Sequence, residues 1–272
     1  LGDYEPAWQH FSRGNALDES VLPAYRPEVA RQGIERIMSQ YSAEWLSQFA
    51  GESADPVFIC GMFRSGSTLL EQMLAAHPAF FAGGESQFFP RLVARELPAY
   101  PDGAKSITRQ KIHDWQRQHA RLSERLLAGT ARLTDKRPDN FLYTGLIKAV
   151  LPSAKFVVTE RDWRDVATSI YSVRLGPGQA YATNLANIRH CIGLQTELVD
   201  HCWSGLARSG MRVACLSIRS PMRLKPQASG RLESLCMPSR LAGGSTIDEI
   251  LQTLLATTSM GDAGRLGISV RS

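Results

Sequence analysis

The amino-acid sequence predicts an α/β protein with a mostly parallel central sheet flanked by helices. A short apolar run at residues 57–60 passes through a glycine-containing loop into apolar residues at helical spacing. A second apolar run at residues 155–160 has the composition of a buried strand, and a helical pattern follows it at once. Alternating strands and helices of this kind build parallel sheets covered by helices. With 272 residues and 43% hydrophobic content, the chain can fill one large core and carry a short helical appendage at its N-terminus.

The loop after the first strand resembles a phosphate-binding loop in its glycine spacing. Gly61 and Gly66 stand at the separation found in nucleotide-binding loops, and Thr68 takes the hydroxyl position. A loop that enters a helix offers N–H groups and the positive end of the helix dipole to a phosphate. Ser67 replaces the lysine of the nucleotide motif, so Arg64 is the only cation in the loop, which argues against ordinary triphosphatase chemistry. Taken alone, the loop is equally consistent with a glycine-rich turn between a strand and a helix.

The N-terminal part of the chain is expected to be helical. Apolar and aromatic side chains recur at helical spacing in residues 3–17 and again in residues 27–49, before the polar linker 51–56. Residues 3–17 look like one helix of a tetratricopeptide repeat, whose array would have to continue upstream, and an ordinary amphipathic helix is an equal alternative. The expected boundaries are 1–50 for the helical segment, 51–218 for the core and 219–272 for an atypical C-terminal tail.

Two further strands are predicted, each with a charged residue at its end. Residues 80–82 form a short strand, and the double glycine that follows leaves Glu85 at the strand end. Another strand begins at Arg132 and ends at Lys136. Because ligands gather at the carboxyl ends of parallel strands, we expect both side chains near the phosphate loop. Taken alone, Glu85 is more typical of a solvated loop residue, and Lys136 is equally typical of a surface lysine.

Helices are expected to follow these strands. Residues 105–128 predict a helix that covers the sheet, and Pro138 starts another that runs to about Val150. Arg161 directly follows the strand at residues 155–160, and Ser169 lies almost two turns into the next helix. An arginine and a serine in this arrangement can both face one anion.

Charge and composition narrow the ligand classes. The net charge of +5 and the pI of about 9.1 suit a small polyanionic ligand. We expect no nucleic-acid binding, because no lysine and arginine run with interleaved aromatic residues is present. The pairs His190-Cys191 and His201-Cys202 would lie roughly 16 Å apart along a helix, too far for one metal ion.

Cysteine usage and hydropathy predict a cytoplasmic protein. The five cysteines are odd in number and contain no Cys-x-x-Cys pair, which favours a reducing compartment. No apolar run reaches the roughly 18 residues of a membrane span. The chain starts without methionine or a signal-peptide core, so it reads as a fragment or a processed end.

Four motifs together resemble the sulfotransferases that use 3′-phosphoadenosine 5′-phosphosulfate (PAPS), over about residues 56–210. The similarity is greatest to the bacterial type with an N-terminal tetratricopeptide array, which is related to protein-tyrosine sulfotransferases. The order and separation of the motifs agree with that family. The motifs are Gly61-Met-Phe-Arg-Ser-Gly-Ser-Thr-Leu69, Gly83-Gly-Glu85, Asp135-Lys-Arg-Pro-Asp-Asn-Phe141 and Arg161-Asp-x-x-Asp-x-x-x-Ser169.

The resemblance implies a role for each candidate site residue. Glu85 would be the general base that takes the acceptor's proton, and Arg64 with Lys136 would stabilise the transferring group and the leaving oxygen. Arg161 and Ser169 would hold the 3′-phosphate of PAPS, and no metal would be required. The 5′-phosphosulfate would be held by Arg64, Ser65, Gly66, Ser67 and Thr68.

The sequence also departs from the family pattern. Phe63 stands where proline is usual, and Ser67 stands where threonine is usual. Residues 211–218 begin as a strand, but the usual Tyr-Glu continuation and Arg-Trp ending do not follow. After Trp203 the chain contains no aromatic residue, which is a break in composition. An altered reading frame near Val213 and a divergent C-terminal subdomain with a helix at residues 246–257 are equal explanations.

Three functions follow from these features. The first is a PAPS-dependent sulfotransferase acting on an acceptor hydroxyl, in a peptide tyrosine, a sugar, a lipid or a small alcohol. The second is a catalytically impaired protein that still binds PAPS or its product. The third is a P-loop kinase for a small hydroxyl compound, against which the missing loop lysine counts. A tetratricopeptide array would add a protein partner.

Overall fold

A six-stranded sheet forms the centre of the structure, a computed structural model that describes residues 4–49, 51, 53–76, 79–127, 132–206, 213–218 and 268–271. The strands are β1 (Val57–Gly61), β2 (Phe80–Ala82), β3 (Arg132–Lys136), β4 (Lys155–Arg161), β5 (Val213–Ile218) and β6 (Ile268–Arg271). Their order across the sheet is β2-β3-β1-β4-β5-β6, and only the β5–β6 pair is antiparallel. The predicted mostly parallel α/β fold is therefore confirmed.

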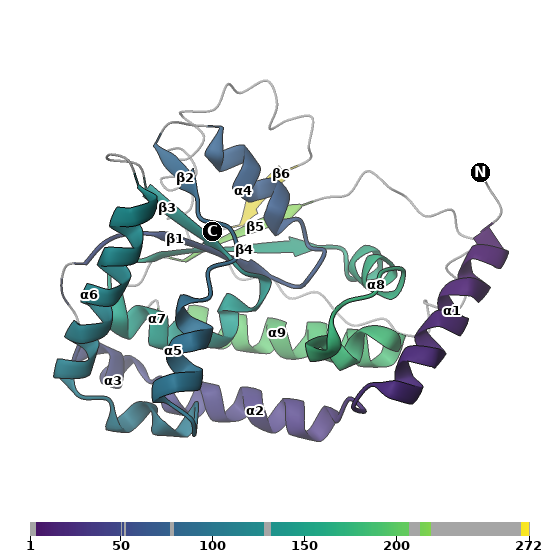
Figure 1. The fold of residues 1–272 in the computed structure, drawn as a ribbon, viewed down its shortest axis with the longest axis horizontal. Coiled ribbons are helices and arrows are strands. Elements are labelled where there is room, and N and C mark those ends of the chain that lie inside the picture. Colours follow the sequence, from purple (N-terminus) through teal and green to yellow (C-terminus); the bar gives the residue numbers. More distant parts are fainter. Residues whose placement is uncertain are drawn as a thin grey trace.

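Helices cover both faces of this sheet, as Figure 1 shows, with α4 above it and α7, α9 and α2 stacked below it. The α-helices are α1 (Tyr4–Val21), α2 (Pro27–Gln40), α3 (Ala43–Ser47), α4 (Ser67–Ala75), α5 (Phe88–Glu96), α6 (Arg109–Leu126), α7 (Thr144–Val150), α8 (Trp163–Tyr171) and α9 (Leu185–Leu206). The 3-10 helices are η1 (Asp102–Ser106), η2 (Pro138–Tyr143) and η3 (Pro177–Thr183). No helix in these described ranges is long and apolar enough to span a membrane.

The central strands are buried on both faces, which explains their unbroken apolar sequences. The parallel register places Phe58 of β1 beside Phe156 of β4, and their rings stack with centroids 5.5 Å apart. Both belong to the main core below the sheet, which also contains Leu146 of α7 and Leu198 of α9. Side chains alternate along a strand, so Ile59, the residue after Phe58, faces the opposite side of the sheet, where α4 packs.

The strand order creates a switch point beside β1. From β1 the chain first builds β2 and β3 on one side, and it then crosses to build β4 on the other side. The loops that leave the carboxyl ends of β1 and β4 therefore diverge. Open α/β sheets bind ligands in the crevice between such diverging loops. The candidate site residues predicted from strand ends all belong to this edge.

Several predicted elements have different boundaries in the structure. The helical stretch 27–49 is interrupted at Ser42, whose hydroxyl accepts a hydrogen bond from Trp45 N and starts a separate helix. The helix predicted at 105–128 starts only after Thr108, which caps α6. The helix expected from Pro138 begins as a 3-10 helix before α7.

The C-terminal part agrees with one expectation and lies mostly outside the described residues. Of the strand predicted at 211–218, residues 213–218 form β5. β6, which pairs with it in the antiparallel direction, was not predicted. The helix expected at 246–257 and the bulk of the tail fall outside the described residues, so the two explanations of this region stay open.

Candidate active site at the carboxyl edge of the sheet

The loop between β1 and α4 is tightly folded and ends at an open helix N-terminus. Arg64 and Gly66 have positive φ angles of 69° and 102°. Gly61 is required by packing, since a Cβ there would lie 2.5 Å from the carbonyl oxygen of Thr159. Gly66 caps α4 without a side chain, and no acidic residue follows in the first turn. The N-terminal amides and dipole of α4 therefore favour an anion.

Ser65 fixes this loop from inside. Its side chain is buried, and its N–H donates to the carbonyl oxygen of Met62. Its hydroxyl lies 2.6 Å from Thr159 Oγ1, which in turn donates to the carbonyl oxygen of Cys60 at 3.2 Å. Because the single hydroxyl proton of Thr159 is used on Cys60, Ser65 is the donor in their contact. The N–H and hydroxyl groups of Ser65 thus form hydrogen bonds within the protein, whereas Arg64 and Thr68 are exposed.

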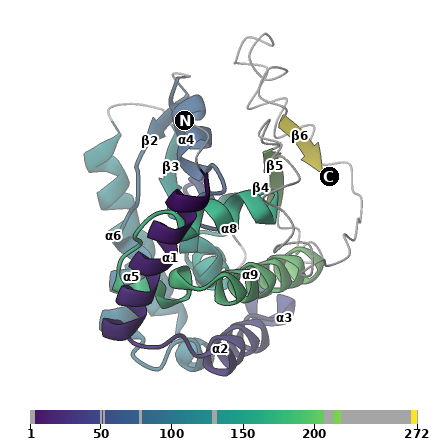
Figure 2. The ribbon, with the colours of Figure 1, turned by 90° about the vertical axis from the view of Figure 1, so that its right-hand side faces the viewer.

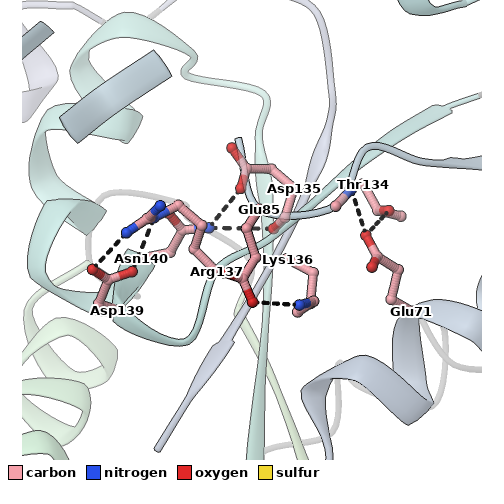
Figure 3. A network of polar contacts seen from close by, with 9 residues as sticks. Glu71, Glu85, Thr134, Asp135, Lys136, Arg137, Asp139 and Asn140 are labelled. Atoms are coloured by element: carbon pink, nitrogen blue, oxygen red, sulfur yellow. Dashed lines mark hydrogen bonds and ion pairs between the residues drawn. The ribbon is translucent and has the colours of Figure 1, made fainter. Parts of the chain in front are cut away.

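Glu85 and Lys136 meet at the carboxyl end of β3, as expected from their strand ends. Lys136 Nζ donates to Glu85 Oε1 at 2.7 Å. The lysine side chain is only 8% exposed, whereas that of Glu85 is 52% exposed and open to a reaction partner. Figure 3 shows this pair, with Asp135 and Arg137 beside it. The arrangement joins a carboxylate that is accessible to solvent with a buried cation.

The residues that follow Lys136 hold the end of β3 in place. Asn140 is fully buried, and its Nδ2 donates to the carbonyl oxygen and to Oδ1 of Asp135 at 3.2 and 3.1 Å. Burial raises the pKa of Asp135 to about 7, and the hydrogen bond from Asn140 acts in the opposite direction. Arg137 closes the turn by pairing with Asp139 at 3.0 and 2.8 Å. These contacts give Lys136 a fixed backbone.

A second group of site residues lies between the loop and α8. Arg64 Nε donates to Ser169 Oγ at 2.9 Å, which joins the loop to α8. Arg161, the last residue of β4, donates from Nη1 to the carbonyl oxygen of Arg64 and pairs with Asp165 at 3.4 Å. Asp162 accepts from Arg164 N at 2.9 Å and caps α8.

The predicted site residues therefore form two groups at one edge of the sheet. Glu85 and Lys136 meet at the end of β3. Arg64 lies in the loop after β1, Arg161 at the end of β4, and Ser169 on α8. The hydrogen bonds of Arg64 place it in the second group. In the described part of the chain, no set of three or more His, Cys, Asp or Glu side chains is placed to hold a metal ion.

Several supporting residues were missed by sequence reasoning. Asp162 was quoted in the fourth motif, but its role as the N-cap of α8 was not assigned, although it directly precedes a helical pattern. Thr159 and Glu71 carried no such signal, because their partners Ser65 and Thr134 are 94 and 63 residues away in sequence. Contacts of this range follow only from the fold.

Comparison with known proteins identifies related sequences. The chain is 28% identical over 220 residues to an uncharacterized protein of Aquifex aeolicus (strain VF5), covering 73% of this chain and 28% of that protein. It is 27% identical over 169 residues to protein-tyrosine sulfotransferase A of Caenorhabditis elegans, covering 54% of this chain and 41% of that protein. The chain thus spans less than half the length of these relatives.

The sulfotransferase domain from the curacin biosynthetic pathway is a similar solved structure, with 16% identity and a TM-score of 0.45. The match covers 78% of this chain and 77% of that domain. The sequence model of the Sulfotransferase family matches residues 56–211, which is more than half of the chain and contains both groups of site residues. The chain belongs to the sulfotransferase family.

Proposed function

We propose that the chain moves a sulfuryl group from PAPS to an acceptor hydroxyl by in-line transfer, with Glu85 as the general base. The observation that carries this proposal is the contact between the half-exposed Glu85 carboxylate and the buried Lys136 ammonium, at the sheet edge beside the β1–α4 loop. A general base must be reachable by the acceptor and held in place, and this pair meets both requirements. Membership of the sulfotransferase family supports a sulfuryl group as the group that is transferred.

The residues around the loop suit a donor with two phosphate groups. The open N-terminus of α4 and the exposed Thr68 suit the phosphate that carries the sulfuryl group. Arg64 uses one N–H on Ser169, and its guanidinium has four further donors for an anion. Arg161 and Ser169 suit the 3′-phosphate, because arginine binds phosphate oxygens in pairs. Bound PAPS would supply an activated sulfuryl group attached to a phosphate leaving group.

The charge of each side chain determines its role in the proposed reaction. Glu85 accepts the proton of the acceptor hydroxyl as that oxygen attacks the sulfur. Lys136 orients Glu85 through their ion pair, and Lys136 and Arg64 offset the negative charge that grows on the leaving oxygen. The chemistry requires no metal ion when these cations and the amides of α4 neutralise the phosphates.

Binding of 3′-phosphoadenosine 5′-phosphate (PAP) and loss of turnover in Glu85→Gln test the proposal. PAP should bind in calorimetry to both proteins, while turnover should fall by about 10²- to 10⁴-fold in the variant. Glu124→Gln, an exposed glutamate on α6, is the control and should leave turnover unchanged. Peptides containing tyrosine are the first acceptors to test, because a relative is a protein-tyrosine sulfotransferase. Sugars, lipids and small alcohols follow.

Two results would contradict the proposal. Absence of PAP binding together with tight binding of ATP and magnesium would favour a kinase for a small hydroxyl compound. Binding of PAP without turnover on any acceptor class would favour a protein that binds the nucleotide and has lost catalysis.

A further inference from the structure

A buried carboxylate on α4 reaches from the predicted donor site to the loop that carries Glu85. Glu71 is 3% exposed and lies one helical turn after Ser67, on the same face of α4. Its Oε1 accepts hydrogen bonds from Gly84 N and from Thr134 Oγ1, both at 3.0 Å. In Figure 3, Glu71 extends from α4 toward Thr134, beside the Glu85–Lys136 pair. Burial of a carboxylate is costly unless such donors compensate for lost water.

The residue held by Glu71 determines the direction of Glu85. Gly84 has a left-handed backbone with φ of 64°, and its carbonyl oxygen accepts from Lys136 N at 2.8 Å. The N–H bonded to Glu71 belongs to the peptide plane before Gly84, and the carbonyl belongs to the plane after it. Both torsion angles of Gly84 are therefore restrained. The second plane is the one from which Glu85 starts.

The neighbouring glycine closes the loop on β3. Gly83 N donates to the carbonyl oxygen of Thr134 at 3.0 Å, and a Cβ at Gly83 would lie 2.3 Å from that oxygen. Thr134 thus contacts the loop through its carbonyl and Glu71 through its hydroxyl. The bonds join α4, the end of β3 and the loop 83–85 into one unit.

We propose that Glu71 is a positioning residue that sets the general base Glu85 in register with the donor held at the start of α4. The inference rests on the proposed function and adds a residue to it. Glu71 touches neither substrate, because its carboxylate is buried behind the loop. Its effect passes through Gly84, and misplacement of a base by about 1 Å can cost 10²-fold in rate.

Two variants of Glu71 and one control variant of Gln72 test this role. Glu71→Met keeps the length of the side chain but cannot accept a hydrogen bond, and kcat should fall by about 10- to 10²-fold with the dissociation constant of PAP within about threefold. Glu71→Gln retains an acceptor oxygen and should restore kcat to within about threefold of the original protein. Gln72→Met makes a similar change at the next, exposed position of α4 and should change nothing. A kcat for Glu71→Met equal to that of the unchanged protein, or no rescue by Glu71→Gln, would overturn the inference.

A further variant and an independent readout cover the remaining outcomes. If Glu71→Met does not fold, Glu71→Asp keeps the charge but is one methylene shorter, and an unchanged kcat in it would overturn the inference. If the unchanged protein shows no turnover, the proposed function fails, and hydrogen exchange of residues 83–86 still tests Glu71. Exchange there should be faster in Glu71→Met than in Glu71→Gln, and equal rates would refute the contact as the cause of the loop geometry.

Discussion

At the level of single residues, the buried and the exposed hydroxyl groups of the β1–α4 loop have different roles. Ser65 is buried and donates to Thr159, whereas Thr68 is exposed at the start of α4. A hydroxyl that is already used within the protein contributes to the shape of the loop. An exposed hydroxyl beside a helix N-terminus can donate to a bound anion.

Substitution of each hydroxyl should therefore separate stability from binding. Ser65→Ala removes a buried hydrogen bond and should lower the free energy of unfolding in urea by about 1 to 2 kcal/mol. Thr68→Val should change that free energy by less than about 0.5 kcal/mol. It should nevertheless weaken PAP binding by about tenfold, since a hydrogen bond to a charged group is lost. Weaker PAP binding in Ser65→Ala with unchanged stability would instead show that the Ser65 hydroxyl turns to the ligand.

The candidate site was partly predictable at this scale. Glu85 and Lys136 were expected near each other because both follow parallel strands, whose carboxyl ends share an edge. The sequence could not predict that Arg64 lies apart from the Glu85–Lys136 pair, because its position depends on the hydrogen bond to Ser169 of α8. The inward orientation of Ser65 depends equally on Thr159, whose position is set by β4.

At the scale of elements, helices with one apolar stripe were easier to predict than helices packed on several sides. The 22-residue helix α9 was considered only in placing its two His-Cys pairs, and its bounds were not predicted. It contacts α2, α8 and η3, so its apolar residues do not form a single stripe. α5 was missed because Pro90 lies in its first turn, where proline is tolerated but is easily mistaken for a break. Apart from β6, which was not predicted, the strands were predicted well, because short runs ending in glycine or in a charged residue are local signals.

The packing of α6 against α5 introduces a pH dependence through His119. Burial lowers the pKa of His119 to about 4, and its ring lies 5.1 Å from that of Phe88. In the unfolded chain this imidazole takes up a proton at about pH 6.5, while in the folded protein it does so only near pH 4. Stability should therefore be lost as the pH falls from 6.5 to 4, by up to about 3 kcal/mol.

Urea unfolding of the unchanged protein and of His119→Phe at pH 7 and pH 4.5 measures this effect. Phenylalanine keeps an aromatic ring in the core but has no proton to gain. The difference in unfolding free energy should move in favour of His119→Phe as the solution is acidified. A difference that is the same at both pH values would show that His119 is not a source of acid sensitivity.

At the scale of the whole molecule, the strand order brings distant segments to one edge. β1 lies between β3 and β4, so the loop after β1 has Glu85 and Lys136 on one side and Arg161 on the other. Under the proposed function, a donor with two phosphates and an acceptor would therefore meet over β1. The sheet brings these segments together, and the local contacts of Glu71 and Ser65 hold the loops after β2 and β1 in position.

Helix α1 lies at one end of the molecule in Figure 1 and in front of the other elements in Figure 2. Its side chains bond to α8 and to the residues that follow α8. Trp8 stacks on Tyr171 of α8 with ring centroids 4.9 Å apart, and Asp18 pairs with Arg174. None of the 18 residues of α1 is buried, whereas α2 and α9 contribute to the main core. Whether α1 ends a tetratricopeptide array stays a prediction. Its few apolar contacts place it at the low end of local stability.

Amide hydrogen exchange should show this difference directly. The amides of residues 4–21 should exchange several orders of magnitude faster than those of α9, because α1 can detach without opening the core. Trp8→Ala should accelerate exchange in α1 further and leave α2 unchanged, since the stack on Tyr171 is its main aromatic contact with α8. Tyr4→Ala, at a position that is 79% exposed, is the matched control and should have no effect. Protection of α1 equal to that of α9 would mean that the helix unfolds only with the whole domain.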